Sequence, residues 1–425
     1  MDIDEVLREE RKLDEPDKEI LEFLKKETKE FVKRLKEEIV RQKINADVFV
    51  GGSFARGTLL KIDKCDIDIF VRFDWKIDDI SSLLERIVNG VSKGEKLKIA
   101  KIRGSRDYFR IEKDKVIFEV IPVYKIKKPR EARNVTDLSY FHVNYIKRKL
   151  KLGKLANEII LAKQFCQAQR VYGAESYIQG FSGYALECLI INYKSFLKML
   201  RELIKVEDRV VLDPEKHYEN KNEVLFSLNE SRLQSPIILV DPTWKERNVL
   251  AALSKETFKK FKDRAREFLK KPSMSFFKII GIDANNLRKI AKDKKREFVH
   301  LKIYTDKQRG DIAGTKMKKF ARFLENETRK YFDIFAHEFN YDEAQEADFY
   351  LVVKPKNKVV VYGPPLNMKE HAVAFRKRHK NAFERGGNLY VEEKVDFSCR
   401  KFFEKFVKYQ KKKLEEMGIV KMKVK

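Results

Sequence analysis

The sequence has little glycine, proline and cysteine, and it has no long apolar run. With 17 glycines and 10 prolines in 425 residues, collagen-like and linker-dominated chains are excluded. No stretch approaches the roughly 18 apolar residues of a membrane-spanning helix, and the charged start does not resemble a signal peptide. We therefore expect a cytoplasmic protein without membrane contact. The cysteines lie far apart without a C-x-x-C pair, which argues against a disulfide framework or a zinc site and favours buried thiols: Cys65, Cys166, Cys188 and Cys399.

What the sequence does have is apolar material and an unevenly placed positive charge. Its 43% of hydrophobic residues are enough for about two to four domains. The net charge is +27, yet the first hundred residues hold 21 Lys and Arg against 23 Asp and Glu, while the remainder holds 72 against 43. Such an excess is expected of a protein that binds phosphates of a nucleic acid. A Lys-rich thermophilic surface would give the same composition, so charge leaves both interpretations open.

Hydrophobic periodicity divides the chain into three predicted domains. Residues 1–128 read as an α+β head, residues 129–272 as a helical central domain, and residues 273–425 as an α/β body and tail of the ferredoxin-like type. In the head we expect helices at 16–43 and 83–90 and strands at 47–50, 66–73, 97–103, 107–112 and 115–126.

The second and third domains carry longer patterns. The helical domain should contain helices at 155–170, 184–203 and 255–269, with an interruption near 207–245 and a loop that carries Asp241-Pro242. In the last domain we expect strands at 298–304, 348–353 and 359–361 and helices at 315–332, 367–383 and 400–416. The Lys-rich end after residue 420 reads as a solvated tail.

A glycine turn follows the first predicted strand. Gly51, Gly52 and Ser53 lead into a short segment that ends with Arg56. A strand that turns through glycines into a helix leaves backbone N–H groups pointing outward, where they can bind phosphate. Ser53 and Arg56 could add a hydroxyl and a guanidinium. Taken alone, however, a Gly-Gly-Ser turn is usually no more than a turn.

Three carboxylates are predicted on neighbouring strands. Asp66 and Asp68 lie two residues apart in a strand, so they share one face. They suit Mg²⁺, which takes one or two carboxylates and completes its shell with phosphates and water, or they form the polar face of an edge strand. Glu119 lies within the apolar run Val116–Tyr124 and needs a cation or a partner there. A third carboxylate next to the first two would complete a two-metal site for nucleotidyl transfer.

These residues resemble a known family. A Gly-Ser turn, a D-x-D strand and a third carboxylate strand are the signature of nucleotidyltransferases of the DNA polymerase β superfamily. The segments VYGAESYIQGFSGY, DPTWKERNVLAALS and PSMSFFK are similar to the archaeal (class I) CCA-adding tRNA nucleotidyltransferases, over nearly the whole chain. The resemblance implies a polymerase β-like head and addition of C, C and A to the 3′ end of tRNA from CTP and ATP, with Mg²⁺ and without a template. It also implies a homodimer formed through the C-terminal part.

The resemblance assigns roles to individual residues. It makes Asp66, Asp68 and Glu119 the metal-binding carboxylates, and it places phosphate contacts at Ser53 and Arg56, beside Gly52. Further nucleotide contacts fall on His142, Lys163 and Tyr172, base recognition on Arg247, and a weaker candidate on Ser139. Archaeal relatives commonly show Glu-x-Asp with a third Asp, whereas this chain has Asp-x-Asp with a third Glu.

Each assignment has an ordinary structural alternative. Lys163 could be a solvated helix residue, His142 a helix cap, Tyr172 a core residue, and Arg247 a partner of Trp244. All of these would have to hold together, while a single triphosphate pocket accounts for every one.

The case for RNA rests on basic segments. Residues 369–385 interleave Phe375 and Phe383 with many basic side chains, and residues 125–130 form a second basic run. An enzyme that adds only A, only CC or a tail to other RNAs is the alternative of the same chemistry. A noncatalytic RNA-binding protein is the alternative of another class, and a P-loop kinase is disfavoured because no G-x-x-x-x-G-K-[ST] segment occurs.

Overall fold

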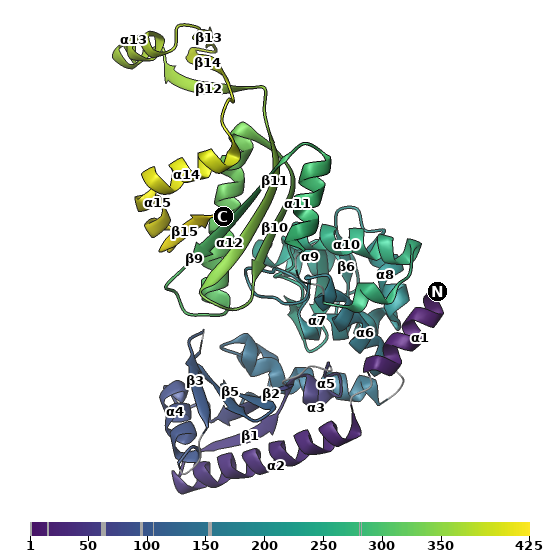
Figure 1. The fold of residues 1–425 in the computed structure, drawn as a ribbon. Helices are drawn as coiled ribbons and strands as arrows, with labels where there is room; N and C mark the ends of the chain where they lie inside the picture. The colour runs from purple at the N-terminus through teal and green to yellow at the C-terminus, as the bar shows by residue number, and fades with distance from the viewer. Residues whose placement is uncertain are drawn as a thin grey trace. The chain divides into compact units, whose positions relative to one another are not determined.

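The computed structural model describes residues 2–14, 17–60, 65–93, 97–104, 106–151, 155–279, 281 and 283–425. The chain divides into two compact units, Met1–Ile279 and Ile280–Lys425 (Figure 1). The first unit contains both the predicted head and the predicted helical domain. Among the described residues, none of the helices has the length and apolar character that a membrane crossing requires. All four thiols are buried and none forms a disulfide.

The head is built on a five-stranded sheet. Its strand order is β1-β2-β5-β4-β3, with β2 and β5 parallel and the other neighbouring pairs antiparallel. All five predicted strands are confirmed. Their bounds are β1 Ala46–Val50, β2 Cys65–Phe73, β3 Lys98–Ile102, β4 Tyr108–Lys113 and β5 Val116–Tyr124.

One face of this sheet is apolar, and the other carries charged side chains. On one face, alternate residues of β2 and β5 are apolar and pack beneath α2 (Lys18–Arg41) and α4 (Ile80–Val91), where Phe31 stacks on Phe118 with ring centroids 4.3 Å apart. Because side chains alternate along a strand, the other residues of β2 and β5 emerge on the opposite face. That face holds the predicted carboxylates, so one strand pattern builds both the core and the site.

The rest of the first unit is mainly helical and surrounds an aromatic core centred on Phe165. The predicted single helix at 184–203 is in fact two helices, because Lys194 adopts a left-handed φ of 67° and Ser195 caps the second helix. The predicted loop at Asp241 is also wrong, since Asp241 ends a buried strand, β7, that forms a hairpin with β8. The elements are α1 Ile3–Asp14, α3 Gly52–Arg56, α5 Ser139–Leu150, α6 Leu155–Ala168, α7 Gly183–Tyr193, α8 Phe196–Leu203, β6 Val210–Leu212, α9 Lys221–Ser227, β7 Ile237–Asp241, β8 Trp244–Asn248 and α10 Lys255–Lys270.

The second unit contains the predicted ferredoxin-like arrangement. Its sheet has the antiparallel order β10-β11-β9-β15, and helices α12 and α14 complete a β-α-β-β-α-β succession. The predicted solvated tail is wrong, because β15 pairs with β9 and buries Met422. The bounds are α11 Ala284–Asp293, β9 Glu297–Tyr304, α12 Asp311–Tyr331, β10 Phe332–Tyr341, β11 Glu346–Pro355, α14 Cys399–Tyr409, α15 Lys411–Glu416 and β15 Lys421–Val424.

A small module lies in the sequence between β11 and α14. It consists of a three-stranded sheet, β12-β14-β13, with helix α13 against β12. The predicted helix at 367–383 ends at Arg378, and residues from Phe383 onward form a hairpin that turns at Gly386 and Gly387. The bounds are β12 Lys358–Pro365, α13 Lys369–Arg378, β13 Phe383–Arg385 and β14 Asn388–Lys394.

Candidate active site

The glycine turn packs directly on the second strand. The backbone N–H of Gly51 donates a hydrogen bond to the carbonyl of Asp68 at 2.8 Å. Gly52 has a φ of +64°, and a Cβ atom placed there would lie 1.7 Å from Oδ2 of Asp68. Only glycine meets both conditions without strain. The turn and the Asp68 carboxylate are therefore one structural unit, and Ser53 follows it in the short helix α3.

Three carboxylates and one arginine lie on the polar face of the sheet. Asp68 of β2 is in register with Glu119 of β5, which is in register with Arg110 of β4. Asp66 precedes Asp68 by two residues and so shares its face. The guanidinium of Arg110 lies 3.6 Å from Oδ1 of Asp66. The arrangement places negative charge on two adjacent strands, with a cation beside it.

The electrostatics of this face favour binding of a cation. Burial raises the pKa of the Asp68 carboxyl, the charge of Asp66 adds to the increase, and Arg56 and Lys163 oppose it. Within the described residues, no three His, Cys, Asp or Glu side chains converge into a group able to hold a metal ion by themselves. The carboxylate oxygens of Asp66 and Asp68 are of the kind that a hard divalent ion takes, with phosphate and water completing its shell.

A buried ionic network joins the end of α3 to helices α6 and α7. Glu187 of α7 is completely buried, and its carboxylate receives the Nε of Arg56 at 2.8 Å and the Nζ of Lys163 at 2.8 Å. Lys163 also donates to Oγ1 of Thr58 at 2.9 Å. Lys163 is only 1% exposed, so the alternative of a solvated helix residue is wrong. The network fixes the end of the glycine turn to the helical part of the same unit.

Glu187 depends on its partners for its charge. Burial alone would raise the pKa of this carboxyl, but the charges of Arg56 and Lys163 and the hydrogen bonds from Lys163 and Thr58 lower it to about 2. A carboxyl group whose pKa is lower in the folded protein than in the unfolded chain stabilises the fold at pH values above its unfolded pKa. This stabilisation is lost as the pH falls to the pKa of the folded protein. The network should therefore be intact at neutral pH and fail in acid.

We predict that Glu187→Gln lowers the free energy of unfolding at pH 7 by about 3 kcal/mol or more, because two buried cations lose their counter-ion. The difference in unfolding free energy between the variant and the unsubstituted protein should shrink as the pH falls from 4.5 to about 2. In this range Glu187 is protonated in the unfolded chain but still ionised in the folded protein. Urea unfolding at several pH values measures both effects. Glu202→Gln on α8, a surface residue paired with Lys205, is the matched control and should change stability by less than about 0.5 kcal/mol. A pH-independent difference would contradict the charged state assigned to Glu187.

A second buried carboxylate organises the remaining predicted residues. Asp241 is fully buried and accepts hydrogen bonds from Nη1 of Arg247 at 2.7 Å and from the hydroxyl of Tyr184 at 3.1 Å. Nε2 of His142 lies 3.1 Å from the same carboxylate, and the His142 ring stacks on Tyr184 at 3.9 Å. Burial lowers the pKa of His142, while Asp241 opposes that decrease. Arg247 thus pairs with Asp241, and the Trp244 ring is instead approached by Arg232.

Helix α7 connects the two clusters. Tyr184 and Glu187 lie three residues apart and so share one helix face. Tyr172 reaches the beginning of the same helix, since a Cβ at Gly183 would lie 2.8 Å from its hydroxyl and 3.6 Å from Cε of Lys163. The structure therefore brings Arg56, Lys163 and Tyr172 together around Glu187, and His142 and Arg247 together around Asp241, next to Tyr184 on the same face of α7. Ser139 begins α5, the helix of His142.

Sequence reasoning missed the two carboxylates that hold these clusters. Glu187 lies in the apolar run Ala185–Tyr193, which is the same signal that identified Glu119. Asp241 follows four buried apolar residues of β7, a run that lies inside the interruption predicted near 207–245. Arg110 gives no signal, because an arginine in an alternating strand pattern is ordinary.

Two protein-family models match most of the first compact unit. Residues 28–139 match the family described as nucleotidyltransferase domain, and residues 157–278 match the family described as tRNA nucleotidyltransferase, second domain. A CCA-adding enzyme of Nanoarchaeum equitans is 34% identical over 358 residues, which are 83% of this chain and 85% of that protein. The chain belongs to the family of the CCA-adding enzymes. A second member of the family, from Methanocaldococcus jannaschii, is 29% identical over 414 residues, covering 93% of this chain and 88% of its own.

Solved structures share the fold of the family. A structure of Cid1, described as having RNA terminal uridylyl transferase activity, superposes with a TM-score of 0.51 at 12% identity and covers 65% of this chain and 98% of that chain. At this identity the likeness concerns the fold alone. It supports the polymerase β-like nucleotidyltransferase architecture expected for the head.

Proposed function

We propose that this protein adds C, C and A to the 3′ end of tRNA, using CTP and ATP, without a template and with release of pyrophosphate. The observation that carries the proposal is the packing of the glycine turn on Asp68, in register with Glu119, in a chain of this family. This arrangement joins a phosphate-binding turn to a carboxylate face. Nucleotidyl transfer needs both, because a triphosphate must be held while charge develops on it.

Asp66, Asp68 and Glu119 are the residues proposed to hold Mg²⁺. When bound, the metal supplies a Lewis acid that lowers the cost of charge on the attacking hydroxyl and on the leaving phosphate oxygens. The chain's own residues position the reactants. The N–H groups of the turn at Gly52 and Ser53 face the triphosphate, and the guanidinium of Arg56, 12% exposed and anchored on Glu187, offers a fixed positive charge.

The bond changes are those of an in-line displacement. The terminal ribose hydroxyl of the RNA gives its proton to solvent water, and its oxygen forms a bond to the α-phosphorus. The bond from this phosphorus to the bridging oxygen breaks, and pyrophosphate leaves. Lys163 and Tyr172 support the triphosphate end of the pocket from the α7 side, while His142 and Arg247 support the sugar and base end. Lys163 acts mainly by holding Thr58 and Glu187 in place, since its ammonium is buried among them.

The proposed RNA contacts extend into the second unit. Helix α13 ends in the basic residues Arg376, Lys377 and Arg378, and the module around it exposes Tyr362, Val373 and Phe383. Exposed rings among cations suit unpaired bases and phosphates. Homodimer formation through this part of the chain remains a prediction from the family resemblance.

The direct test is extension of a tRNA transcript that lacks its last three nucleotides, resolved at single-nucleotide length. With Mg²⁺ we expect two additions from CTP alone, three from CTP with ATP, and none when EDTA is present. A long tail from a single nucleotide would instead identify a poly(A)-type enzyme. Binding of the transcript without extension would identify a noncatalytic RNA-binding protein.

We also predict a loss of base selection on Arg247→Lys. The lysine keeps the positive charge next to Asp241 but loses the planar pair of donors that can read a base edge. Loss of one hydrogen bond from the charged guanidinium to the base costs about 1.5–3 kcal/mol. The preference for CTP over UTP, measured as the ratio of their kcat/KM values, should therefore fall about tenfold or more. Arg232→Lys, beside Trp244, is the control. Unchanged selection in Arg247→Lys would remove this residue from the base pocket.

A further inference from the structure

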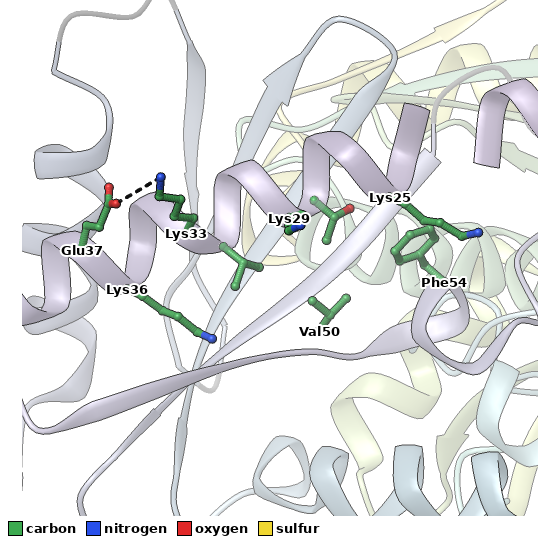
Figure 2. A pocket seen from close by; sticks show the side chains of 9 residues that line it. Lys25, Lys29, Lys33, Lys36, Glu37, Val50 and Phe54 are labelled. Atoms are coloured by element: carbon green, nitrogen blue, oxygen red, sulfur yellow. Dashed lines mark ion pairs between the residues drawn. The ribbon is translucent and has the colours of Figure 1, made fainter. Parts of the chain in front are cut away.

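A cationic groove lies along helix α2, outside the site described above (Figure 2). We call it the lysine groove and define it by Lys25, Lys29, Lys33 and Lys36 of α2 together with Val50 of β1 and Phe54 of α3. Its cavity measures about 550 Å³. The lysines recur at every third or fourth residue, so they form one row about 16 Å long on the helix. Figure 2 shows the Phe54 ring close to Lys25 and Val50 beneath the middle of the row.

The lysine groove is more basic than the rest of the first hundred residues. The first hundred residues carry no basic excess, yet four lysines and the single acidic residue Glu37 line this groove. Lys25 pairs with Glu22 at 2.7 Å and Lys33 with Glu37 at 3.7 Å. All four side chains are exposed, so these two pairs neutralise little of the charge. Within the described part of the chain, neither Lys29 nor Lys36 has an acidic partner. Lys29 and Lys36 thus present positive charge for which the described fold supplies no counter-ion.

The lining between the lysines is apolar. Val32, Val50 and Phe54 are only partly covered and border the groove. A row of cations beside a partly exposed aromatic ring is a combination that suits single-stranded nucleic acid, with phosphates on the cations and a base on the ring. An acidic protein segment would use the lysines but would gain little from the aromatic ring.

The groove is separate from the carboxylate face. Helix α2 covers the apolar face of the sheet, while Asp66, Asp68 and Glu119 lie on the opposite face. The two regions meet only at α3, where Phe54 lies between Ser53 and Arg56. A strand in the groove therefore passes behind the glycine turn and does not occupy the site of chemistry.

We propose that the lysine groove binds a single-stranded segment of RNA, with its phosphates on Lys25, Lys29, Lys33 and Lys36 and a base against Phe54. The inference goes beyond nucleotide addition and rests on the proposed function only in taking RNA as the partner. It predicts binding that is sensitive to salt, independent of nucleotide triphosphates and independent of divalent metal.

The test uses the double variant Lys29→Glu/Lys36→Glu and the matched control Lys18→Glu/Lys26→Glu, which makes the same charge change at exposed α2 positions outside the groove. Anisotropy of a labelled single-stranded oligoribonucleotide, in EDTA and without triphosphates, gives Kd at several salt concentrations. We expect Kd to rise at least tenfold more in the groove variant than in the control. The slope of log affinity against log salt should fall by about 1.4, or about 0.7 for each lost phosphate contact.

A second measurement locates the RNA directly. An oligoribonucleotide that carries 4-thiouridine should cross-link to peptides containing Lys29 or Phe54, and Phe54→Leu should weaken RNA binding but not binding of poly-glutamate. Equal Kd values for the groove and control variants, with no cross-link to these peptides, would overturn the proposal. Poly-glutamate binding that depends on Lys29 and Lys36 without matching RNA binding would also overturn it, in favour of an acidic protein partner. Because neither assay requires catalysis, their failure is distinguishable from failure of the proposed nucleotidyl transfer.

Discussion

Replacing Asp68 by Asn should reduce nucleotide addition at least a thousandfold. The substitution removes one negative charge from the face formed with Asp66 and Glu119, and charge stabilisation of this kind supplies several kcal/mol to phosphoryl transfer. Single-turnover addition to a tRNA that lacks its terminal nucleotide measures the effect. Asp78→Asn, at an exposed position after the same strand, is the matched control and should retain full activity.

The fold of the Asp68→Asn protein should survive. Burial and the neighbouring Asp66 raise the pKa of Asp68, which means that its ionised form costs stability in the absence of a bound cation. The neutral amide should therefore melt at the same temperature as the unsubstituted protein, or higher, at pH 7. Retained activity would exclude Asp68 from the proposed site, and a large drop in melting temperature would mean that the loss of activity reflects unfolding.

Gly52→Ala should have the second largest effect. The added Cβ would lie 1.7 Å from Oδ2 of Asp68, and the residue must also hold a φ of +64°, which L side chains rarely adopt. Either the turn or the carboxylate must move, and a displacement of about 1 Å at a reacting centre can cost on the order of a hundredfold in rate. We expect kcat to fall by about that factor.

The chain offers a close control for this substitution. Gly57 ends α3 with a φ of +71°, but nothing lies within 4 Å of a Cβ built there. Gly57→Ala shares the backbone strain, about 1 kcal/mol of stability, without the contact to Asp68. Rates measured for both variants at equal folded fraction separate strain from displacement. Equal losses of kcat would contradict the role given to the packing of Gly52 on Asp68.

The fold was predictable wherever a single periodicity dominated. The helical spacing of Leu24, Phe31 and Leu35 identified α2, and the alternation in β2 and β5 identified both the core and the carboxylate face. The break at Lys194 was not predictable, because a lysine at positive φ carries no local signal. Polar and apolar residues alternate from Lys421 to Val424, but the lysines favoured a solvated tail. The segment forms a strand only by pairing with β9, which local sequence does not show.

The shared face of Asp66 and Asp68 was predictable from the sequence, whereas the contacts that hold the other candidate residues in place were not. Register between Asp68 and Glu119 depends on a parallel pairing of strands separated by about forty residues, which local pattern cannot reveal. The contacts of Glu187 with Arg56 and Lys163 join segments that are distant in sequence, so only tertiary structure shows that these cations share one buried carboxylate. A buried acid in an apolar helix was nonetheless readable, and the same reasoning that selected Glu119 applies to it.

The most direct test of CCA addition is to incubate the protein and Mg²⁺ with a tRNA transcript that lacks its last three nucleotides, in the presence of all four nucleoside triphosphates at equal concentration. The 3′ ends of the products are then sequenced. We expect the products to end in CCA and to grow no further, since the residues proposed to select the nucleotide, Arg247 among them, act together with the RNA end and without a template. Tails of one repeated nucleotide, or ends of mixed sequence, would contradict this expectation.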